Sequence, residues 1–147
     1  MHGPGLTLVV VAQLPPAKFS ALATKKARRP RILIDVRAER FAKQGRIAGA
    51  LNIDLDSLRY RAYAVAERND LVLVYGQEEA DSRKGAIAVE SMGYGDVRYL
   101  AGGFTAWTAA KLPVDTGDLL EVKGPVGFKA APAFGPDVRG EWKTLPP

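Results

Sequence analysis

Short apolar runs alternate with stretches of helical spacing along most of the chain. The runs rich in β-branched and large apolar residues, which are typical of buried strands, are Leu6–Ala12, Arg31–Val36, Leu51–Ile53, Leu71–Tyr75 and Val97–Leu100. Between them, helical spacing predicts a helix opened by Pro15-Pro16 and stopped by Pro30, a helical turn around Arg40-Phe41, and helices over Ser57–Arg68, Arg83–Met92 and Phe104–Lys111. This alternation predicts an α/β fold: a central parallel sheet of about five strands with helices on both faces.

The loop Gly76–Ser82 is the first candidate site. It directly follows the strand predicted over Leu71–Tyr75. In open parallel sheets, ligands bind beyond the carboxyl ends of the strands, so we expect this loop to face a ligand or partner.

The alternating pattern fails from Gly117 onward. Five of the chain's ten prolines fall in its last 23 residues, among scattered glycines. We therefore predict a domain over residues 1–116 and a Pro/Gly-rich C-terminal extension over 117–147. Phe128, Phe134 and Trp142 in that extension would either anchor in a partner's grooves or fold back onto the domain.

Composition places the chain among ordinary globular proteins, with 47% hydrophobic and 25% charged residues in 147. The apolar run Leu6–Ala12 is far shorter than the roughly 20 residues that cross a bilayer, and no basic leader precedes it. We expect a soluble domain without a transmembrane segment, in the cytoplasm or an organellar stroma or matrix rather than secreted.

The net charge of +5 is concentrated near the predicted first helix. The cluster comprises Lys18, Lys25, Lys26, Arg28, Arg29 and Arg31. Such a cluster suits a nucleic acid, an anionic membrane surface or an acidic partner, or is simply a solvated helix end. Because no aromatic residues interleave with these charges, the sequence carries no specific nucleic-acid signal.

There are no cysteines, and the single histidine is His2. Disulfides, thiolate metal sites and cysteine nucleophiles are therefore excluded, and a histidine-based triad or metal cluster has no support. We expect no cofactor and no metal.

Several phrases, in order and with sensible gaps, resemble the rhodanese homology domain of the rhodanese-like family. They are Ile34–Arg37, Gly45–Ile53, Leu71–Tyr75, Gly93-Tyr94 with Val97, Leu100–Phe104 with Trp107, and Leu112–Val114. The resemblance spans roughly Leu6 to Val114 and implies a rhodanese-like fold. In the family, the loop after the central strand carries a catalytic cysteine, and its inward-pointing N–H groups stabilise the thiolate, its persulfide and anionic sulfur donors such as thiosulfate.

The resemblance fails where that chemistry should lie. Gly76 stands at the family's cysteine, Glu79 at its loop glycine and Asp81 at its arginine, whereas Ser82 matches its serine. Gly76 has no side chain to carry sulfur, and the loop's three carboxylates repel an anionic donor. The resemblance thus implies an inactive homologue of thiosulfate sulfurtransferase.

Positions outside the loop both match and depart from the family. Asp35 and Arg37 match, and the resemblance implies that they hold the loop and the sheet edges together by hydrogen bonds. Arg46 and Ala48 stand where the family usually has histidine and proline.

The leading hypothesis is a non-catalytic protein-binding, regulatory or scaffold module. Its candidate binding loop is Gly76, Gln77, Glu78, Glu79, Ala80, Asp81 and Ser82, together with the C-terminal tail, and its acids favour a basic partner. Three alternatives stay open: solvated acids with Asp81 or Ser82 capping the next helix, a sulfurtransferase-related enzyme that uses a cysteine on a partner or sister domain, and an acidic loop that binds Mg²⁺ or Ca²⁺.

Overall fold

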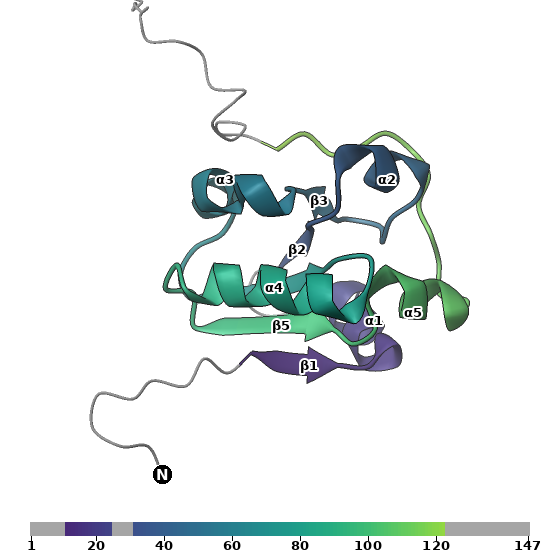
Figure 1. Cartoon of the computed structure of the whole chain (residues 1–147), viewed down its shortest axis with the longest axis horizontal. Helices are drawn as coiled ribbons and strands as arrows, with labels where there is room; N and C mark the ends of the chain where they lie inside the picture. The colour runs from purple at the N-terminus through teal and green to yellow at the C-terminus, as the bar shows by residue number, and fades with distance from the viewer. Residues whose placement is uncertain (1–10, 25–30, 123–147) are drawn as a thin grey trace, which may run out of the picture.

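The fold is a parallel sheet between two layers of helices, in a computed structural model that describes residues 11–24 and 31–122 (Figure 1). The elements in chain order are β1 (Ala12–Leu14), α1 (Pro16–Thr24), β2 (Arg31–Asp35), α2 (Glu39–Gln44), β3 (Leu51–Asn52), the 3-10 turn η1 (Leu55–Ser57), α3 (Leu58–Val65), β4 (Leu71–Tyr75), α4 (Glu79–Glu90), β5 (Asp96–Leu100) and α5 (Gly103–Ala109). The α/β class predicted from the alternating pattern is confirmed.

The sheet has the strand order β1-β5-β4-β2-β3, and all of its pairs are parallel. The central strand β4 is buried along its whole length, which explains its unbroken apolar sequence. Its neighbours β2 and β5 flank it, so the segments that follow all three strands meet at one edge of the sheet.

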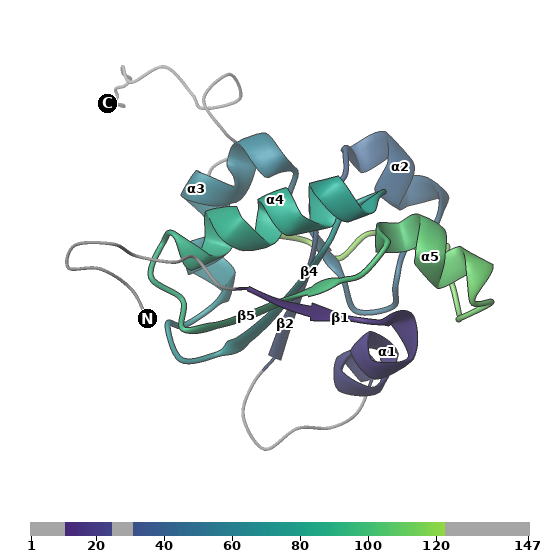
Figure 2. The ribbon, with the colours of Figure 1, turned by 60° about the horizontal axis from the view of Figure 1, so that its bottom comes forward.

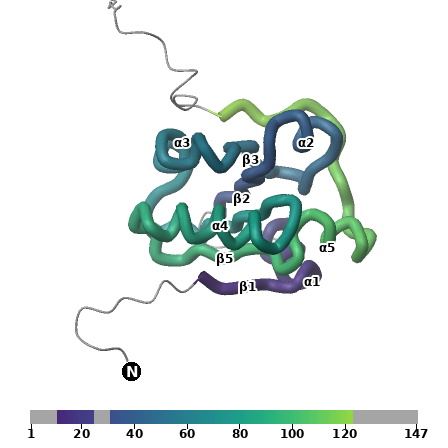
Figure 3. Tube along the Cα trace, viewed as in Figure 1, coloured from purple at the N-terminus to yellow at the C-terminus, as the bar shows by residue number. Residues whose placement is uncertain are grey.

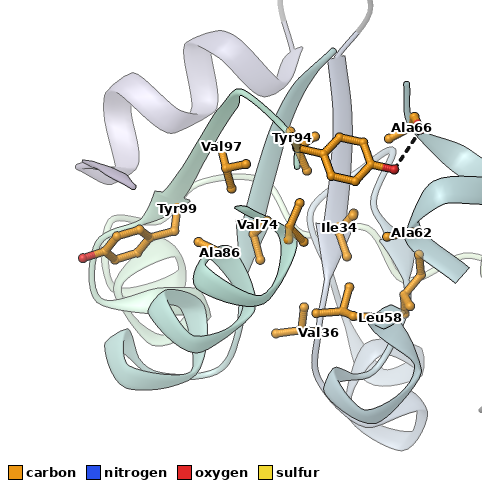
Figure 4. Close-up of a cluster of buried hydrophobic side chains, with 13 residues drawn as sticks. Ile34, Val36, Leu58, Ala62, Ala66, Val74, Ala86, Tyr94, Val97 and Tyr99 are labelled. Atoms are coloured by element: carbon orange, nitrogen blue, oxygen red, sulfur yellow. Dashed lines mark hydrogen bonds between the residues drawn. The ribbon is translucent and has the colours of Figure 1, made fainter. Parts of the chain in front are cut away.

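Successive side chains of the central strands enter different cores. Val72 and Val74 of β4 pack beneath α3 and α4, in the cluster drawn in Figure 4. Leu73 and Tyr75 pack on the opposite face, against residues of α1 and α5. Figure 2 shows the two helical layers from the side. Helices thus cover both faces, as parallel sheets require.

The first strand overlaps the end of the predicted apolar run. β1 covers Ala12–Leu14, so among the described residues it overlaps the predicted run Leu6–Ala12 at Ala12 and continues two residues past it. The remainder of the predicted run, residues 6–10, lies outside the described residues. As an edge strand, β1 is defined by its ladder to Arg98–Leu100 of β5 rather than by buried apolar side chains.

The helix predicted from Arg83 begins four residues earlier, at Glu79. Its start is set by a capping box, in which the Glu78 side chain accepts the Asp81 N–H and the Asp81 side chain accepts the Glu78 N–H. Four of the seven residues of the predicted loop Gly76–Ser82 therefore form the first turn of α4.

After α5 the chain turns back along the domain, past α2 towards α3 (Figure 3). We call residues 113–122 the C-terminal strap. The Nε1–H of Trp107 donates to the Pro113 carbonyl at 2.8 Å, and Arg61 donates to the Val122 carbonyl. The first residues of the predicted extension, 117–122, thus contact the domain, whereas Phe128, Phe134 and Trp142 lie outside the described residues.

Two other sequence features are only partly covered by the structure. Of the basic cluster, Lys18 and Arg31 are described, whereas residues 25–30 and His2 lie outside the described residues. Within the described ranges, no helix has the length and apolar character needed to span a bilayer.

Candidate functional site

The candidate site lies where β2 and β4 end side by side. Asp35 and Tyr75 are paired in register at the ends of these strands. Arg37 follows the first strand, and the loop Gly76–Ser82 follows the second. The fold therefore brings together the two regions singled out in the sequence, Asp35 with Arg37 and the loop.

Asp35, Arg37 and Tyr75 form a buried charged network beneath the loop. The Asp35 carboxylate accepts hydrogen bonds from Arg37 Nε at 3.0 Å and Nη2 at 2.7 Å, and from the Tyr75 hydroxyl at 2.8 Å. The Tyr75 oxygen in turn accepts the Ile47 N–H at 3.1 Å. Because the carboxylate is fully buried and charged groups are stable inside a protein only when paired, these bonds fix all three side chains.

Arg37 also joins this network to the surrounding loops. Its guanidinium donates to the Gly45 carbonyl at 2.7 Å and to Gln77 Oε1 at 3.2 Å. Its Cζ lies 4.2 Å from the centre of the Phe104 ring, in cation–π geometry. The charge of Arg37 is thus already satisfied by Asp35, main-chain oxygen and an aromatic face.

The network shifts the proton affinities of two of its members. Burial raises the pKa of Tyr75 well above its ordinary value, and the nearby Asp35 carboxylate raises it further. For Arg37, burial acts to lower the pKa, but the hydrogen bond and charge of Asp35 outweigh it, and the pKa is raised. Tyr75 is therefore a neutral hydrogen-bonding group at physiological pH and is not poised as an acid or base.

Gly76 has no room for a side chain. A Cβ atom built on it would lie 2.5 Å from Asp81 Cβ, 2.9 Å from the Asp81 carbonyl carbon and 3.0 Å from Ser82 N. The Gly76 N–H donates to the buried Ser82 hydroxyl at 2.8 Å. The first turn of α4 thus packs directly onto Gly76, the residue that the resemblance aligns with the family's cysteine.

Side-chain oxygen atoms of the loop accept hydrogen bonds from several of the loop's own main-chain N–H groups. The Ser82 hydroxyl accepts the N–H of Gly76, and the capping box occupies those of Glu78 and Asp81. In an anion-binding loop, such donors at a helix N-terminus point to the ligand. Here the loop satisfies them internally, which disfavours an anionic sulfur donor.

The loop is also attached to the start of α5. The N–H groups of Phe104 and Thr105 donate to the carbonyls of Gly76 and Gln77, at 2.8 and 3.1 Å. Gly103, with a φ of +66°, lies so close that a Cβ on it would be 2.6 Å from the Gln77 carbonyl oxygen. This close approach requires glycine and holds the loop against α5.

Glu78 and Glu79 remain exposed but make hydrogen bonds to neutral groups. The Thr105 hydroxyl donates to Glu78 Oε2 at 2.6 Å. Glu79 accepts the Gly102 N–H and the Gln13 side-chain amide, each at 2.8 Å. Neither carboxylate forms an ion pair with another described residue, so within the described part of the chain their negative charges face the surface without a paired cation.

Two adjoining hollows border the loop. One, of about 230 Å³, is lined by Val36, Arg37, Ala38, Phe41, Leu55, Gly76, Gln77 and Asp81. The other, of about 320 Å³, is lined by Arg37, Phe41, Gln44, Gly45, Gln77, Phe104, Thr108 and Val114. Phe41 and Val114 are 42% and 41% exposed at their rims. We call this surface, the two hollows with Glu78 and Glu79, the loop face.

Sequence reasoning missed the apolar part of the loop face. The sequence pattern places Phe41 only in a helical turn, and Val114 only at the end of the family resemblance. A single exposed apolar residue has no distinctive sequence signal. The two become neighbours of the loop only because α2 and the C-terminal strap fold over the same edge of the sheet.

Arg46, which the resemblance aligns with the family's usual histidine, holds the C-terminal strap. It is only 2% exposed and donates to the carbonyls of Ala42, Gly117 and Asp118. Its main chain pairs with that of Asp115 in both directions, at 3.0 and 2.7 Å. This departure from the family pattern therefore has a structural consequence that the sequence did not indicate.

The described residues contain no group of three or more His, Cys, Asp or Glu side chains that could hold a metal ion. The acids of the loop are engaged with neutral donors: Glu78 and Asp81 in the capping box, Glu78 also with Thr105, and Glu79 with Gly102. This geometry gives no support to a divalent metal at the loop.

Taken together, the sheet order and the loop at the end of β4 define an α/β domain of the class whose sites lie at the carboxyl edge of a parallel sheet. A model of the rhodanese-like domain family matches residues 16–110. The chain belongs to the rhodanese-like domain family. No curated protein matches it.

Solved structures agree with this assignment. A rhodanese from E. coli, solved with anions, is 32% identical over 60% of this chain and 100% of its own, with a TM-score of 0.52. A rhodanese-like domain from Anabaena is 22% identical over 81% of this chain and 96% of its own, with a TM-score of 0.62. A rhodanese-related protein from Thermoplasma volcanium is 20% identical over 72% and 99%, with a TM-score of 0.60. Within this family, the present chain lacks any cysteine on which a persulfide could form.

Proposed function

We propose that this chain is a non-catalytic rhodanese-like module that binds a protein partner through its loop face. The observation that carries the proposal is the packing at Gly76, where a Cβ would lie 2.5 Å from Asp81 Cβ. Both the nucleophile and the space for it are absent. The loop's hydrogen bonds hold this packing in place. The loop therefore has a fixed conformation that does not accommodate a cysteine side chain, and it differs from a catalytic loop by more than the missing sulfur atom.

The character of that surface supports a protein partner. Phe41 and Val114 expose apolar area around hollows of about 230 and 320 Å³. Interfaces combine such apolar centres with a polar rim, and aromatic residues dominate their hot spots. The rigid network of Asp35, Arg37 and Tyr75 beneath the surface lowers the entropy lost on binding.

The charge of the loop indicates the kind of partner. Glu78 and Glu79 carry negative charges that no described cation balances. A lysine or arginine of the partner, placed beside an apolar residue that enters the hollow at Phe41, would complement both features. We therefore favour a basic, partly apolar segment as the partner of the loop face.

Affinity capture from native lysate tests this proposal with variants that carry uncharged side chains. The double variant Glu78→Gln, Glu79→Gln keeps oxygen acceptors at both positions and removes two charges. Phe41→Ser removes the apolar rim, and Tyr63→Ser, at a 61% exposed residue of α3 outside the loop face, is the matched control. We expect the same partners to be lost in both loop-face variants and retained with Tyr63→Ser.

Two results would contradict the proposal. Thiosulfate–cyanide turnover by the purified chain would show that sulfur transfer survives without a cysteine. Capture of identical proteins by the wild type and both loop-face variants would show that binding uses another surface.

A further inference from the structure

A second groove lies between α3 and α4, beside the loop face. Its volume is about 440 Å³, larger than either hollow of the loop face, and we call it the helix groove. It is lined by Leu55, Asp56, Leu58 and Arg59 from η1 and α3, and by Lys84, Ala88, Ser91 and Met92 from α4 and the turn after it. Leu55 also lines the smaller hollow, so the two surfaces adjoin.

The floor of the helix groove is apolar. Leu58 is buried in the core, and Ala88 and Met92 are partly buried against it. Leu55 remains 38% exposed at the edge. Lys84 and Ala88 lie one turn apart on the same face of α4, and Ser91 and Met92 in the turn after the helix continue this side of the groove.

The rim of the groove is predominantly cationic. Arg59 and Lys84 are exposed on opposite sides, and neither forms an ion pair with another described residue. Asp56 is the acid among the lining residues. The one lining hydroxyl, that of Ser91, already donates to the Ala88 carbonyl at 2.7 Å. The rim groups left to bind a ligand are therefore mainly the side chains of Arg59 and Lys84.

We propose that the helix groove binds an acidic amphipathic segment of a partner protein. Its apolar residues would cover Leu55, Ala88 and Met92, and its aspartate or glutamate side chains would pair with Arg59 and Lys84. A groove between two helices with an apolar floor and a charged rim suits a helical segment, whose apolar and charged residues lie on separate stripes. The charge requirement is opposite to that of the loop face.

This groove goes beyond the proposed function of the loop face and does not depend on it. A partner that occupies both surfaces would place a basic segment beside Glu78 and Glu79, and an acidic segment in the groove between α3 and α4. Binding at both surfaces by linked segments raises the overall affinity without any new contact.

Selection of peptides displayed from a random library against the full chain tests the groove. We expect enriched peptides to combine apolar residues at helical spacing with several acids. Binding of the selected peptides, measured by fluorescence anisotropy, should weaken at least about tenfold for Lys84→Glu, and should weaken as the salt concentration rises. Arg83→Glu is the matched control, since Arg83 is exposed beside Lys84 on α4 but does not line the groove.

The variants separate this inference from the proposed function. Loss of binding with Lys84→Glu, but not with Arg83→Glu or with Glu78→Gln, Glu79→Gln, supports the helix groove. If the selected peptides are basic, and only the double variant Glu78→Gln, Glu79→Gln loses their binding, the inference about the helix groove is overturned and the loop face is supported. A selection that enriches no peptide, or peptides that bind Lys84→Glu and Arg83→Glu equally, overturns the groove without bearing on the loop face.

Discussion

Replacing Gly76 by cysteine supplies the sulfur atom that the family's chemistry requires, and we predict that it restores no sulfur transfer. The new Cβ would lie 2.5 Å from Asp81 Cβ and within 3.0 Å of two main-chain atoms of the first turn of α4. These atoms belong to a helix start and are not the movable end of a flexible side chain. The helix start must therefore shift before a cysteine can fit.

The structure gives the size of the expected destabilisation. Overpacking of a well-packed site costs about 1–3 kcal/mol. Displacing Asp81 also weakens the capping box with Glu78, and loss of a helix cap costs about 1 kcal/mol. We therefore expect Gly76→Cys to lower the free energy of unfolding by about 2–4 kcal/mol, a large part of the 5–15 kcal/mol typical of a domain.

Urea unfolding followed by circular dichroism measures this loss, and thiosulfate–cyanide turnover measures activity. Gly95→Cys is the matched control, because a Cβ on Gly95 meets no atom within 4 Å. It should leave stability within about 0.5 kcal/mol of the wild type and be equally inactive. A Gly76→Cys protein that is as stable as Gly95→Cys, or that turns over thiosulfate, would refute the argument from packing.

Two further predictions concern buried groups beneath and beside the loop face. Tyr75→Phe should lower stability at pH 7 by about 1–3 kcal/mol, because the Ile47 N–H and the Asp35 carboxylate each lose a partner. Since the pKa of Tyr75 is raised in the folded state, its contribution is fully present below the unfolded pKa of about 10 and is lost at higher pH. Urea titrations should therefore show the difference between the two proteins shrinking above about pH 10, and a constant difference would contradict the assignment. Arg46→Ala should release the C-terminal strap and lower the free energy of unfolding by about 2–4 kcal/mol. Charge-assisted hydrogen bonds contribute about 1.5–3 kcal/mol each, but the freed carbonyls regain hydrogen bonds to water. Unchanged hydrogen exchange over residues 113–118 would contradict this prediction.

The parts of the fold that could be predicted are those in which local pattern and burial agree. Val72 and Val74 face one core and Leu73 and Tyr75 the other, so an uninterrupted apolar run was a reliable sign of a strand covered on both sides. The edge strand β1 could not be predicted in the same way. Its position depends on pairing with β5, to which its own three residues contribute little apolar burial.

The site shows a similar division. The strand pattern places the loop at the carboxyl edge of the sheet, and the family resemblance implies that Asp35 and Arg37 hold the loop there. The sequence offered Asp81 or Ser82 as the cap of the next helix, but the N-cap is Glu78, and Asp81 takes part in the capping box from the third helical position. The contact that excludes a cysteine at Gly76 could not be predicted, because it depends on how closely the first turn of α4 approaches the end of β4, and that distance is set by packing and not by residue type.

The way Arg46 holds the C-terminal strap determines which sequence changes the strap tolerates. Its guanidinium binds main-chain carbonyls at Gly117 and Asp118, which every amino acid supplies. The strap can therefore vary in side chains at these positions and still be held. An insertion or deletion between Asp115 and Asp118 would instead move the carbonyls out of reach. Among homologues that keep an arginine at this position, we expect the length of the strap to be more uniform than its sequence.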